Sequence, residues 1–282
     1  MLNLGLIGHH INNSQAGNLI QKLGKEFDVP LNYQIFNLEN DTNNLDTILL
    51  DLKNKFIKGV NVTYPYKEVI LNHCKLLCEE VQLIKSSNTI IFSKEEIIAH
   101  NTDYLGLLKM IDFHQLEQNK KLLIIGGGGI GRSTAFSMGL KVNAEIFLYE
   151  KDPNKAQKLC QDLVDNKIIC HSMNENEVIK NSDLFDGIIN CTPIGHENTP
   201  GVPLPDLKIN NNQWVFDAIY VPAETELIKN AKKSNCKIIY GIDLFIFQGI
   251  ESFLIFSERE DLREKIYLQF DNIRKYFFEK LL

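Results

Sequence analysis

The segment Lys121-Leu122-Leu123-Ile124-Ile125-Gly126-Gly127-Gly128-Gly129-Ile130-Gly131 decides the fold of this chain. An apolar run of strand length leads into a glycine-rich loop, and a helical pattern begins where the loop ends. Gly126, Gly128 and Gly131 have the Gly-x-Gly-x-x-Gly spacing of dinucleotide-binding loops, and Gly129 belongs to the same loop. These glycines permit a tight turn, close approach of backbone to a pyrophosphate, and close packing of helix on strand. The alternative is a ligand-free turn, but such a turn would not need five glycines in six positions, so the segment predicts a dinucleotide site.

The acid that distinguishes NAD from NADP is expected at the end of the following strand. Glu150 follows the apolar run Glu145–Tyr149 and lies 19 residues after Gly131. A carboxylate there accepts hydrogen bonds from the adenosine ribose and repels the 2′-phosphate of NADP, at a cost on the order of 1–4 kcal/mol for charges ~4 Å apart. Lys151 offsets part of this repulsion, and the alternative is that Glu150 is an exposed strand-end acid. The prediction is NAD favoured over NADP.

Strand-like and helical patterns alternate along most of the 282 residues, which predicts an α/β protein, and the length favours two domains. The expected strands are Leu2–Ile7, Leu31–Phe36, Gly59–Val62, Lys121–Ile125, Glu145–Tyr149, Gly187–Asn190, Trp214–Ala218 and Ile238–Tyr240. The expected helices between them are Leu19–Phe27, Leu45–Phe56, Gly131–Leu140, Asn154–Val164 and Glu224–Lys233. Two further helical patterns follow Ile242, the second over Arg259–Leu282, and we expect them to close a core made elsewhere.

The composition argues against nucleic-acid and membrane partners. Thirty Lys and Arg stand against 36 Asp and Glu, and no basic stretch is interleaved with aromatic residues. No apolar run approaches the ~20 residues that span a bilayer. The N-terminal run Met1–Gly8 has no basic region or cleavage site of an export signal, so we expect a cytoplasmic protein.

The cysteines and histidines do not suggest a metal site. Six cysteines are scattered through the chain without a Cys-x-x-Cys pair or a matching histidine cluster, and the seven histidines are dispersed. We therefore expect reduced thiols and no bound metal.

Short polar clusters follow several of the apolar runs. Thr63 and Lys67 come after the strand Gly59–Val62, and further polar clusters occur at 86–89 and 101–103. The carboxyl ends of strands are where α/β proteins bind ligands, so these residues are candidates for a site. The alternative for the 101–103 cluster is a helix cap, for which Thr102 and Asp103 are well suited.

Taken together and in order, these motifs closely resemble the shikimate dehydrogenase family, including its quinate/shikimate dehydrogenase branch, over nearly the whole chain. The matching pieces are Gly5-Leu6-Ile7-Gly8 with Ser14; Asn61-Val62-Thr63 with Pro65 and Lys67; Asn88-Thr89; His100-Asn101-Thr102-Asp103 with Gly106; the glycine loop; Asn190-Cys191-Thr192-Pro193-Ile194-Gly195; Asp217 with Tyr220, Pro222, Thr225 and Leu227; and Gly241 with Leu244 and Gln248.

The resemblance implies two domains and a small-molecule reaction. Residues 1–102 would form an α/β substrate-binding domain completed by C-terminal helices in 242–282, and residues 103–241 would form a Rossmann dinucleotide-binding domain. The activity would be reversible hydride transfer between a nicotinamide and a ring hydroxyl of a shikimate-like carboxylate, in a monomer or homodimer.

The same resemblance assigns roles to individual residues. Lys67 and Asp103 match the catalytic pair, in which the lysine exchanges a proton with the reacting hydroxyl. The matching substrate-binding residues are Ser14, Thr63, Asn88, Tyr220 and Gln248. The matching cofactor-binding residues beyond the glycine loop, Glu150 and Lys151 are Asn190, Thr192, Pro193 and Gly241.

Three positions depart from the family pattern. Most members have a second hydroxyl residue where this chain has Ala16, so one carboxylate contact is missing unless His9, His10 or an asparagine nearby replaces it. Glu150-Lys151-Asp152 stands where NADP-dependent members carry Asn-Arg-Thr, which agrees with the prediction of NAD. His196 follows Gly195 where methionine is common. Two alternatives therefore stay open: a dehydrogenase acting on quinate, and a non-catalytic nucleotide sensor.

Overall fold

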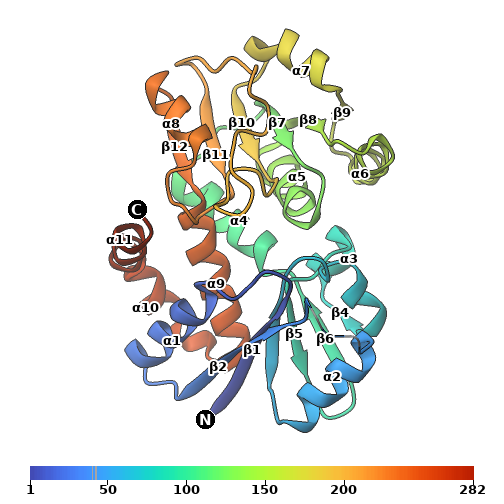
Figure 1. The fold of residues 1–282 in the computed structure, drawn as a ribbon, viewed down its shortest axis with the longest axis vertical. Coiled ribbons are helices and arrows are strands. Elements are labelled where there is room, and N and C mark those ends of the chain that lie inside the picture. The colour runs from blue at the N-terminus through green and yellow to red at the C-terminus, as the bar shows by residue number, and fades with distance from the viewer. Residues whose placement is uncertain (40, 42) are drawn as a thin grey trace. The chain divides into compact units, whose positions relative to one another are not determined.

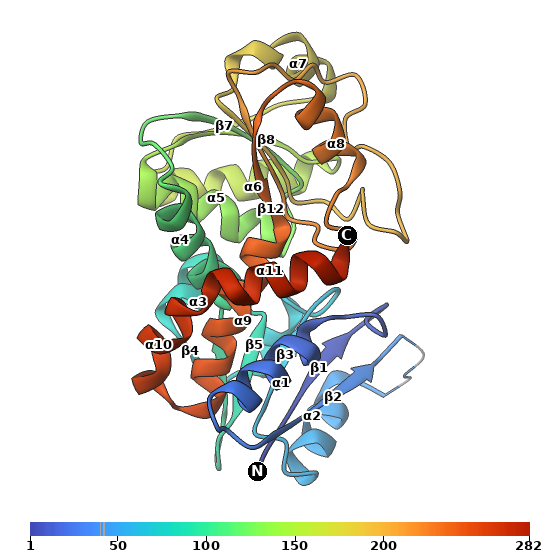
Figure 2. The ribbon, with the colours of Figure 1, turned by 90° about the vertical axis from the view of Figure 1, so that its left-hand side faces the viewer.

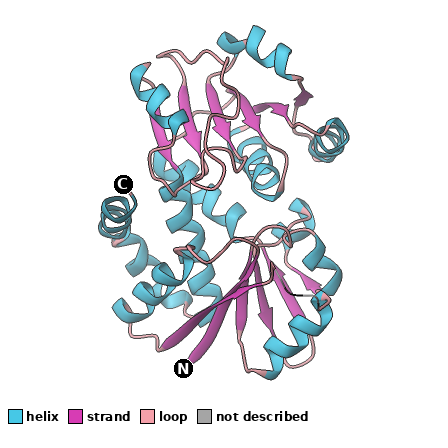
Figure 3. Ribbon diagram, viewed as in Figure 1, coloured by secondary structure: helices cyan, strands magenta, loops and turns pink. Residues whose placement is uncertain are grey.

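The computed structural model describes residues 1–39, 41 and 43–282, which form two compact units. The first unit contains Met1–Gly106 and Ile246–Asp271, and the second contains Leu107–Phe245 and Asn272–Leu282. Figure 3 shows helices beside the sheet of each unit. This mixed architecture confirms the predicted α/β class. In this division residues 272–282 go with the second unit, and the domain boundaries expected from the sequence remain a proposal.

The first unit contains a mixed sheet with the strand order β2-β1-β3-β5-β6-β4 (Figure 1). Its strands are β1 (Leu2–Gly8), β2 (Leu31–Asn37), β3 (Gly59–Val62), β4 (Leu76–Leu77), β5 (Thr89–Phe92) and β6 (Ile97–His100). Its helices include α1 (Ala16–Glu26), α2 (Leu45–Asn54) and α3 (Glu79–Ile84), with a 3-10 turn, η1, at Val69–His73. Strand β1 pairs in parallel with β2 and β3, β5 is antiparallel to β3 and β6, and β4 is parallel to β6.

The C-terminal helix α9 (Gly241–Ser257) packs against this sheet through its later residues. A Cβ atom at Gly59 of β3 would meet the Phe256 ring at 2.8 Å, and one at Gly249 would meet Leu19 of α1 at 2.2 Å. The absence of side chains at these two glycines therefore allows α9 to lie close to β3 and α1. Phe253 and Phe256 are fully buried.

The segment expected as one helix over Arg259–Leu282 is divided into three. The 3-10 turn η3 (Glu260–Leu262) precedes α10 (Arg263–Leu268) and α11 (Phe270–Leu281). The N–H of Gln269 bonds to the Ile266 carbonyl, three residues back, which tightens the turn and ends α10.

The sheet of the second unit is parallel at every strand pair and has the order β12-β11-β10-β7-β8-β9. Its strands are β7 (Lys121–Ile125), β8 (Glu145–Tyr149), β9 (Cys170–Ser172), β10 (Gly187–Asn190), β11 (Trp214–Asp217) and β12 (Lys237–Tyr240). Helix α4 (Thr102–His114) begins in the first unit and continues into the second. The other helices of the second unit are α5 (Gly129–Val142), α6 (Pro153–Asp165), α7 (Glu175–Lys180) and α8 (Glu226–Lys233), with a 3-10 turn, η2, at Ser182–Leu184.

Both faces of this sheet are covered, as parallel strands require. Leu123 and Ile125 of β7 belong to a core that also contains Val178 of α7 and Leu227 of α8. Alternate residues of the strand point to the other face, on whose side α5 and α6 lie in Figure 2. Burial on both faces explains why these strands are continuously apolar. No helix among the described residues is long and apolar enough to cross a membrane.

All eight strands expected from the sequence are present within the described residues, whereas β4, β5, β6 and β9 were not predicted. The expectation of six reduced cysteines was wrong. Cys160 of α6 and Cys170 of β9 form a disulfide with a Cα–Cα distance of 5.3 Å. The two residues come together because α6 and β9 pack side by side after a short turn, which the spacing of the cysteines does not reveal.

Candidate active site

Lys67 and Asp103 form an ion pair within the first unit. The lysine Nζ lies 2.6 Å from Oδ2 of Asp103, and the two side chains are 21% and 9% exposed. Lys67 is the fifth residue after β3, and Asp103 lies in the first turn of α4. The negative charge of Asp103 at the N-terminus of α4 is favoured by the helix dipole. An accessible amine is thereby held in a fixed position.

The loop before β5 connects the segments that carry the two residues. The N–H of Ser87 donates to the carbonyl of Lys67 at 2.7 Å, and its hydroxyl donates to the carbonyl of His100 at 2.8 Å. Asp103 lies three residues after His100. The two bonds therefore fix the distance between the segment that carries Lys67 and the segment that carries Asp103. Ser87 was not assigned a role from the sequence, since its effect passes through main-chain atoms.

Asn88 lies beside this pair and presents an amide nitrogen. Its Oδ1 accepts hydrogen bonds from the Thr102 N–H at 2.7 Å and the Thr102 hydroxyl at 3.1 Å. Within the described part of the chain its Nδ2 makes no hydrogen bond, although the residue is only 4% exposed. A nearly buried amide donor of this kind suits a ligand hydroxyl, because an unmatched donor is costly.

A buried network of hydrogen bonds lies next to Asn88. Asn61 of β3 donates to the hydroxyls of Thr89 and Ser252 at 3.0 and 2.9 Å, and it accepts from the Tyr33 hydroxyl. Thr102 and Ser252 are also within hydrogen-bond distance, at 2.9 Å. Sequence reasoning did not identify Ser252, which comes from α9 and is distant in the chain.

Ser14, Thr63 and Gln248 lie on the same unit. The Ser14 hydroxyl accepts from the N–H of Ala16 at 3.3 Å, which places it at the start of α1. A Cβ at Gly8 would lie 2.4 Å from the methyl group of Thr63. Gln248 lies against α4, because a Cβ at Gly106 would be 2.7 Å from its backbone nitrogen.

The loop that lacks a second hydroxyl residue contains a histidine–tyrosine contact. His9 Nε2 lies 2.9 Å from the Tyr66 hydroxyl, and the two rings meet edge to face. The backbone N–H of His9 donates to the carbonyl of Tyr64. Burial, followed by the charge of Asp41, raises the pKa of Tyr66. His9 therefore contacts the residue that directly precedes Lys67 in the chain.

In the second unit the glycine loop has the geometry that a pyrophosphate needs. Gly126 has a φ of +98°, and a Cβ at Gly131 would lie 2.0 Å from the carbonyl oxygen of Gly126. A Cβ at Gly128 would meet nothing within 4 Å, so space is open above the N-terminus of α5. The residues present therefore fit a dinucleotide phosphate.

Glu150 folds back onto this loop. Its Oε2 accepts from the N–H of Gly127 at 2.7 Å, and its Oε1 accepts from the N–H of Asp152 at 3.1 Å. The neighbouring Lys151 is exposed. In dinucleotide-binding domains an acid at the end of the second strand accepts hydrogen bonds from the adenosine ribose. The carboxylate of Glu150 lies at this position, beside the glycine loop.

Asn190 and Asp217 organise the loop after β10. Asn190 accepts from the N–H and hydroxyl of Thr192, at 2.9 and 2.7 Å, and donates to Asp217 Oδ1 at 3.0 Å. Asp217 also accepts from Thr225. Burial raises the pKa of Asp217 to about 6, although its hydrogen bonds from Thr225, Ile219 and Asn190 favour the charged form.

Three further candidate residues, Pro193, Gly241 and Tyr220, are in the second unit. Pro193 lies in the loop that Asn190 holds, and its carbonyl accepts from the N–H of His196. Gly241 permits close approach of backbone, since a Cβ there would lie 2.3 Å from the Ile219 carbonyl oxygen. Tyr220 stacks on Phe245 with ring centroids 4.4 Å apart. The structure thus gathers Lys67, Asp103 and Asn88 in one unit and the cofactor residues in the other.

Comparison with known proteins identifies the family. The family model of the shikimate dehydrogenase substrate binding domain matches residues 6–90. A Clostridium botulinum protein named shikimate dehydrogenase (NADP(+)) is 34% identical over 251 residues, covering 88% of this chain and 94% of that protein.

Two solved structures share the fold. Quinate dehydrogenase from Corynebacterium glutamicum in complex with NAD has a TM-score of 0.87 at 22% identity, covering 99% of both chains. A shikimate dehydrogenase in complex with NADP+ has a TM-score of 0.85 at 27% identity, covering 100% of this chain and 96% of that chain. The protein is an NAD(P)-dependent oxidoreductase. The chain belongs to the shikimate dehydrogenase family.

Proposed function

We propose that the protein interconverts shikimate and 3-dehydroshikimate by hydride transfer with a nicotinamide dinucleotide. The observation that carries the proposal is the Lys67–Asp103 ion pair beside the buried Asn88 amide, in a chain that matches the family's substrate-binding domain. The dinucleotide, when bound, accepts the hydride in one direction and supplies it in the other.

Lys67 handles the proton of the reaction. In the oxidation direction its neutral amine takes the proton of the reacting hydroxyl as the hydride leaves the adjoining carbon, so a carbonyl remains. In the reduction direction its ammonium gives a proton to the developing alkoxide. Asp103 accepts a hydrogen bond from Lys67 and holds Nζ in place, at 2.6 Å.

Asn88 and its neighbours position the substrate ring. The Nδ2 of Asn88 donates to a ring hydroxyl while Oδ1 remains on Thr102. Thr63 and Gln248 supply further polar contacts to ring hydroxyls, and Ser14 and Tyr220 bind the carboxylate. Several polar contacts to one small ligand reject analogues that lack a hydroxyl, because the unmatched groups of the site lose their partners.

For the cofactor we propose NAD in preference to NADP. The support is Glu150, whose carboxylate is fixed beside the glycine loop by two backbone N–H groups. The Clostridium botulinum relative is named for NADP(+), so the proposed preference for NAD over NADP rests on Glu150 of this chain. Besides Glu150, the residues proposed to bind the cofactor are those of the glycine loop and Lys151, Asn190, Thr192, Pro193 and Gly241.

Quinate is the second candidate substrate. Ala16 removes a hydroxyl contact at the start of α1, and the His9–Tyr66 pair offers different polar groups.

The intact Lys67–Asp103 pair argues against a sensor without turnover. Cytoplasmic localisation and a monomeric or dimeric state stay predictions.

Initial rates of NAD and NADP reduction with shikimate and with quinate test the proposal. Shikimate oxidation supports it, faster turnover of quinate favours the second candidate, and absence of turnover with both substrates contradicts it. The ratio of rates with the two cofactors tests the preference for NAD separately.

A further inference from the structure

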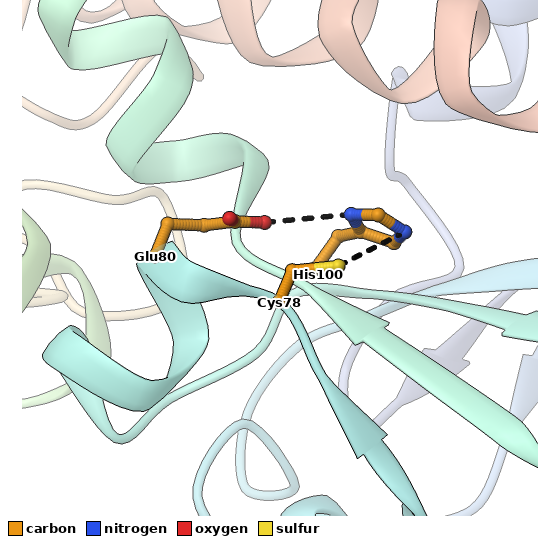
Figure 4. A group of neighbouring side chains, drawn as sticks. All are labelled: Cys78, Glu80 and His100. Atoms are coloured by element: carbon orange, nitrogen blue, oxygen red, sulfur yellow. Dashed lines mark hydrogen bonds and ion pairs between the residues drawn. The ribbon is translucent and has the colours of Figure 1, made fainter.

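Cys78, Glu80 and His100 form a cluster that the proposed reaction does not use. Cys78 directly precedes α3, Glu80 lies in the first turn of that helix, and His100 is the last residue of β6. Figure 4 shows the three side chains pointing toward one another. One ligand atom from each residue lies within 4.8 Å of the other two.

The register of two short parallel strands brings these residues together. Leu76 and Leu77 of β4 pair with Ile98 and Ala99 of β6, and the Cys78 N–H donates to the Ala99 carbonyl at 3.1 Å. Cys78 is therefore opposite His100, the next residue of β6. The cluster was missed in the sequence because the residues are 22 positions apart and neither strand was predicted.

Two of the separations in the cluster approach those between ligand atoms of a tetrahedral zinc ion. His100 Nε2 lies 3.7 Å from the Cys78 sulfur, and Nδ1 lies 3.4 Å from Glu80 Oε1. With bonds of about 2.0–2.3 Å, ligand atoms around zinc are roughly 3.3–3.6 Å apart. The two distances involve different ring nitrogens, and one ligand atom from each residue lies within 4.8 Å of the others, so the side chains must move closer together to bind one ion.

The charge of the cluster also suits a divalent cation. A thiolate, a carboxylate and a neutral imidazole carry two negative charges, equal and opposite to that of the ion. Glu79 and Glu80, in the first turn of α3, place negative charge next to Cys78, and negative surroundings favour a cation. The Glu80 and His100 side chains are 14% and 21% exposed, which leaves the cluster reachable from solvent.

We propose that Cys78, Glu80 and His100 bind a borderline-soft divalent cation of the zinc class, with water in the fourth position. Without the ion, the same groups are joined by hydrogen bonds, and Glu80 Oε1 also accepts from the N–H of Asn101 at 3.3 Å. Binding replaces the thiol proton by the metal and releases that proton to solvent. Mixed sulfur, nitrogen and oxygen ligands of this kind suit zinc better than magnesium or calcium, which prefer oxygen alone.

The test is direct titration of the tag-free full chain with Co²⁺ as a spectroscopic probe, after treatment with a chelator. Direct binding is measured because His100 of the cluster lies three residues before Asp103. A change in turnover would therefore not show which of the two sites was affected. We expect one equivalent of Co²⁺ with a thiolate-to-metal absorption band in the near ultraviolet, displaced by Zn²⁺ and unaffected by excess Mg²⁺.

Three variants make the test specific. Cys78→Ser should abolish the band and weaken Zn²⁺ binding at least tenfold, and His100→Gln should weaken it similarly. Cys74→Ser is the matched control, because Cys74 is a partly buried thiol of the same unit outside the cluster, and it should behave as wild type. Circular dichroism establishes that each variant is folded. No thiolate band in the wild type, or an equal band in folded Cys78→Ser, overturns the proposal.

Discussion

The Nζ atom of Lys67 lies 2.6 Å from Oδ2 of Asp103, and this ion pair connects the segment after β3 with the first turn of α4. Neither residue is near the other in the sequence. The loop containing Ser87 holds the two segments at a fixed separation through bonds to the carbonyls of Lys67 and His100. An amine positioned in this way suits proton exchange with a ligand hydroxyl.

The first prediction concerns Lys67→Ala. Removing the proton-transfer group should lower kcat by about 10²- to 10⁴-fold, while the dissociation constant of the dinucleotide changes little. Steady-state rates and fluorescence titration with the dinucleotide measure the two quantities. Lys55→Ala is the control, because Lys55 is an exposed lysine of the same unit that forms an ion pair with Asp51. A loss of less than about fivefold would remove the catalytic role from Lys67.

A second prediction separates the two ends of the Asn88 amide. Asn88→Asp retains the oxygen that accepts from Thr102 but replaces the Nδ2 donor. Losing a buried partner costs about 1–3 kcal/mol, so kcat/KM for the substrate should fall roughly 5- to 150-fold. Dinucleotide affinity, measured on the same preparations, should be unchanged. If kcat/KM stays at the wild-type value, Nδ2 does not contact the substrate.

The third prediction tests the cofactor preference. Glu150→Gln keeps an oxygen for the Gly127 N–H but removes the charge that would repel a 2′-phosphate. The ratio of kcat/KM for NADP to that for NAD should rise by roughly ten- to several-hundred-fold. Glu145→Gln, at the start of the same strand, should leave the ratio unchanged. An unaltered ratio in Glu150→Gln would show that this carboxylate does not select the cofactor.

A fourth prediction follows from the buried carboxyl of Asp217. Burial raises its pKa from 3.8 to about 6. The folded protein therefore binds this proton more tightly than the unfolded chain, and the resulting stability is present below pH 3.8 and lost as the pH rises through 6. The difference corresponds to about 3 kcal/mol.

The measurement for Asp217 is urea unfolding of wild type and Asp217→Asn between pH 4 and pH 7. The free energy of unfolding of the wild type, relative to the variant, should decrease across this range and level off above pH 6. Comparing the two proteins at each pH cancels the contributions of the other acids. A constant difference between them would contradict a raised pKa at Asp217.

Local patterns in the sequence predicted the parts of the fold that depend on neighbouring residues. The glycine loop and its strand were predicted from a contiguous segment, because the turn, the phosphate site and the helix start all lie within it. Strands β1 and β7, which are contiguous apolar runs, were predicted for the same reason. Strands β4 and β9 have two and three residues, which is too short to produce a recognisable pattern.

Features that depend on tertiary register were not predicted. The disulfide requires knowledge that α6 lies beside β9, and the cluster at Cys78 requires knowledge that β4 lies beside β6. The roles of Lys67 and Asp103 came from the family resemblance, since composition and spacing alone fit a solvated lysine and a helix cap. The structure adds the contact between them.

The most direct test of the central claim is the initial rate of NAD reduction by the purified protein with shikimate, measured for wild type and Lys67→Ala side by side. We expect clear oxidation of shikimate by the wild type and a loss of two or more orders of magnitude in the variant. No oxidation by a folded wild-type protein that binds NAD, or equal rates for the two proteins, would contradict it.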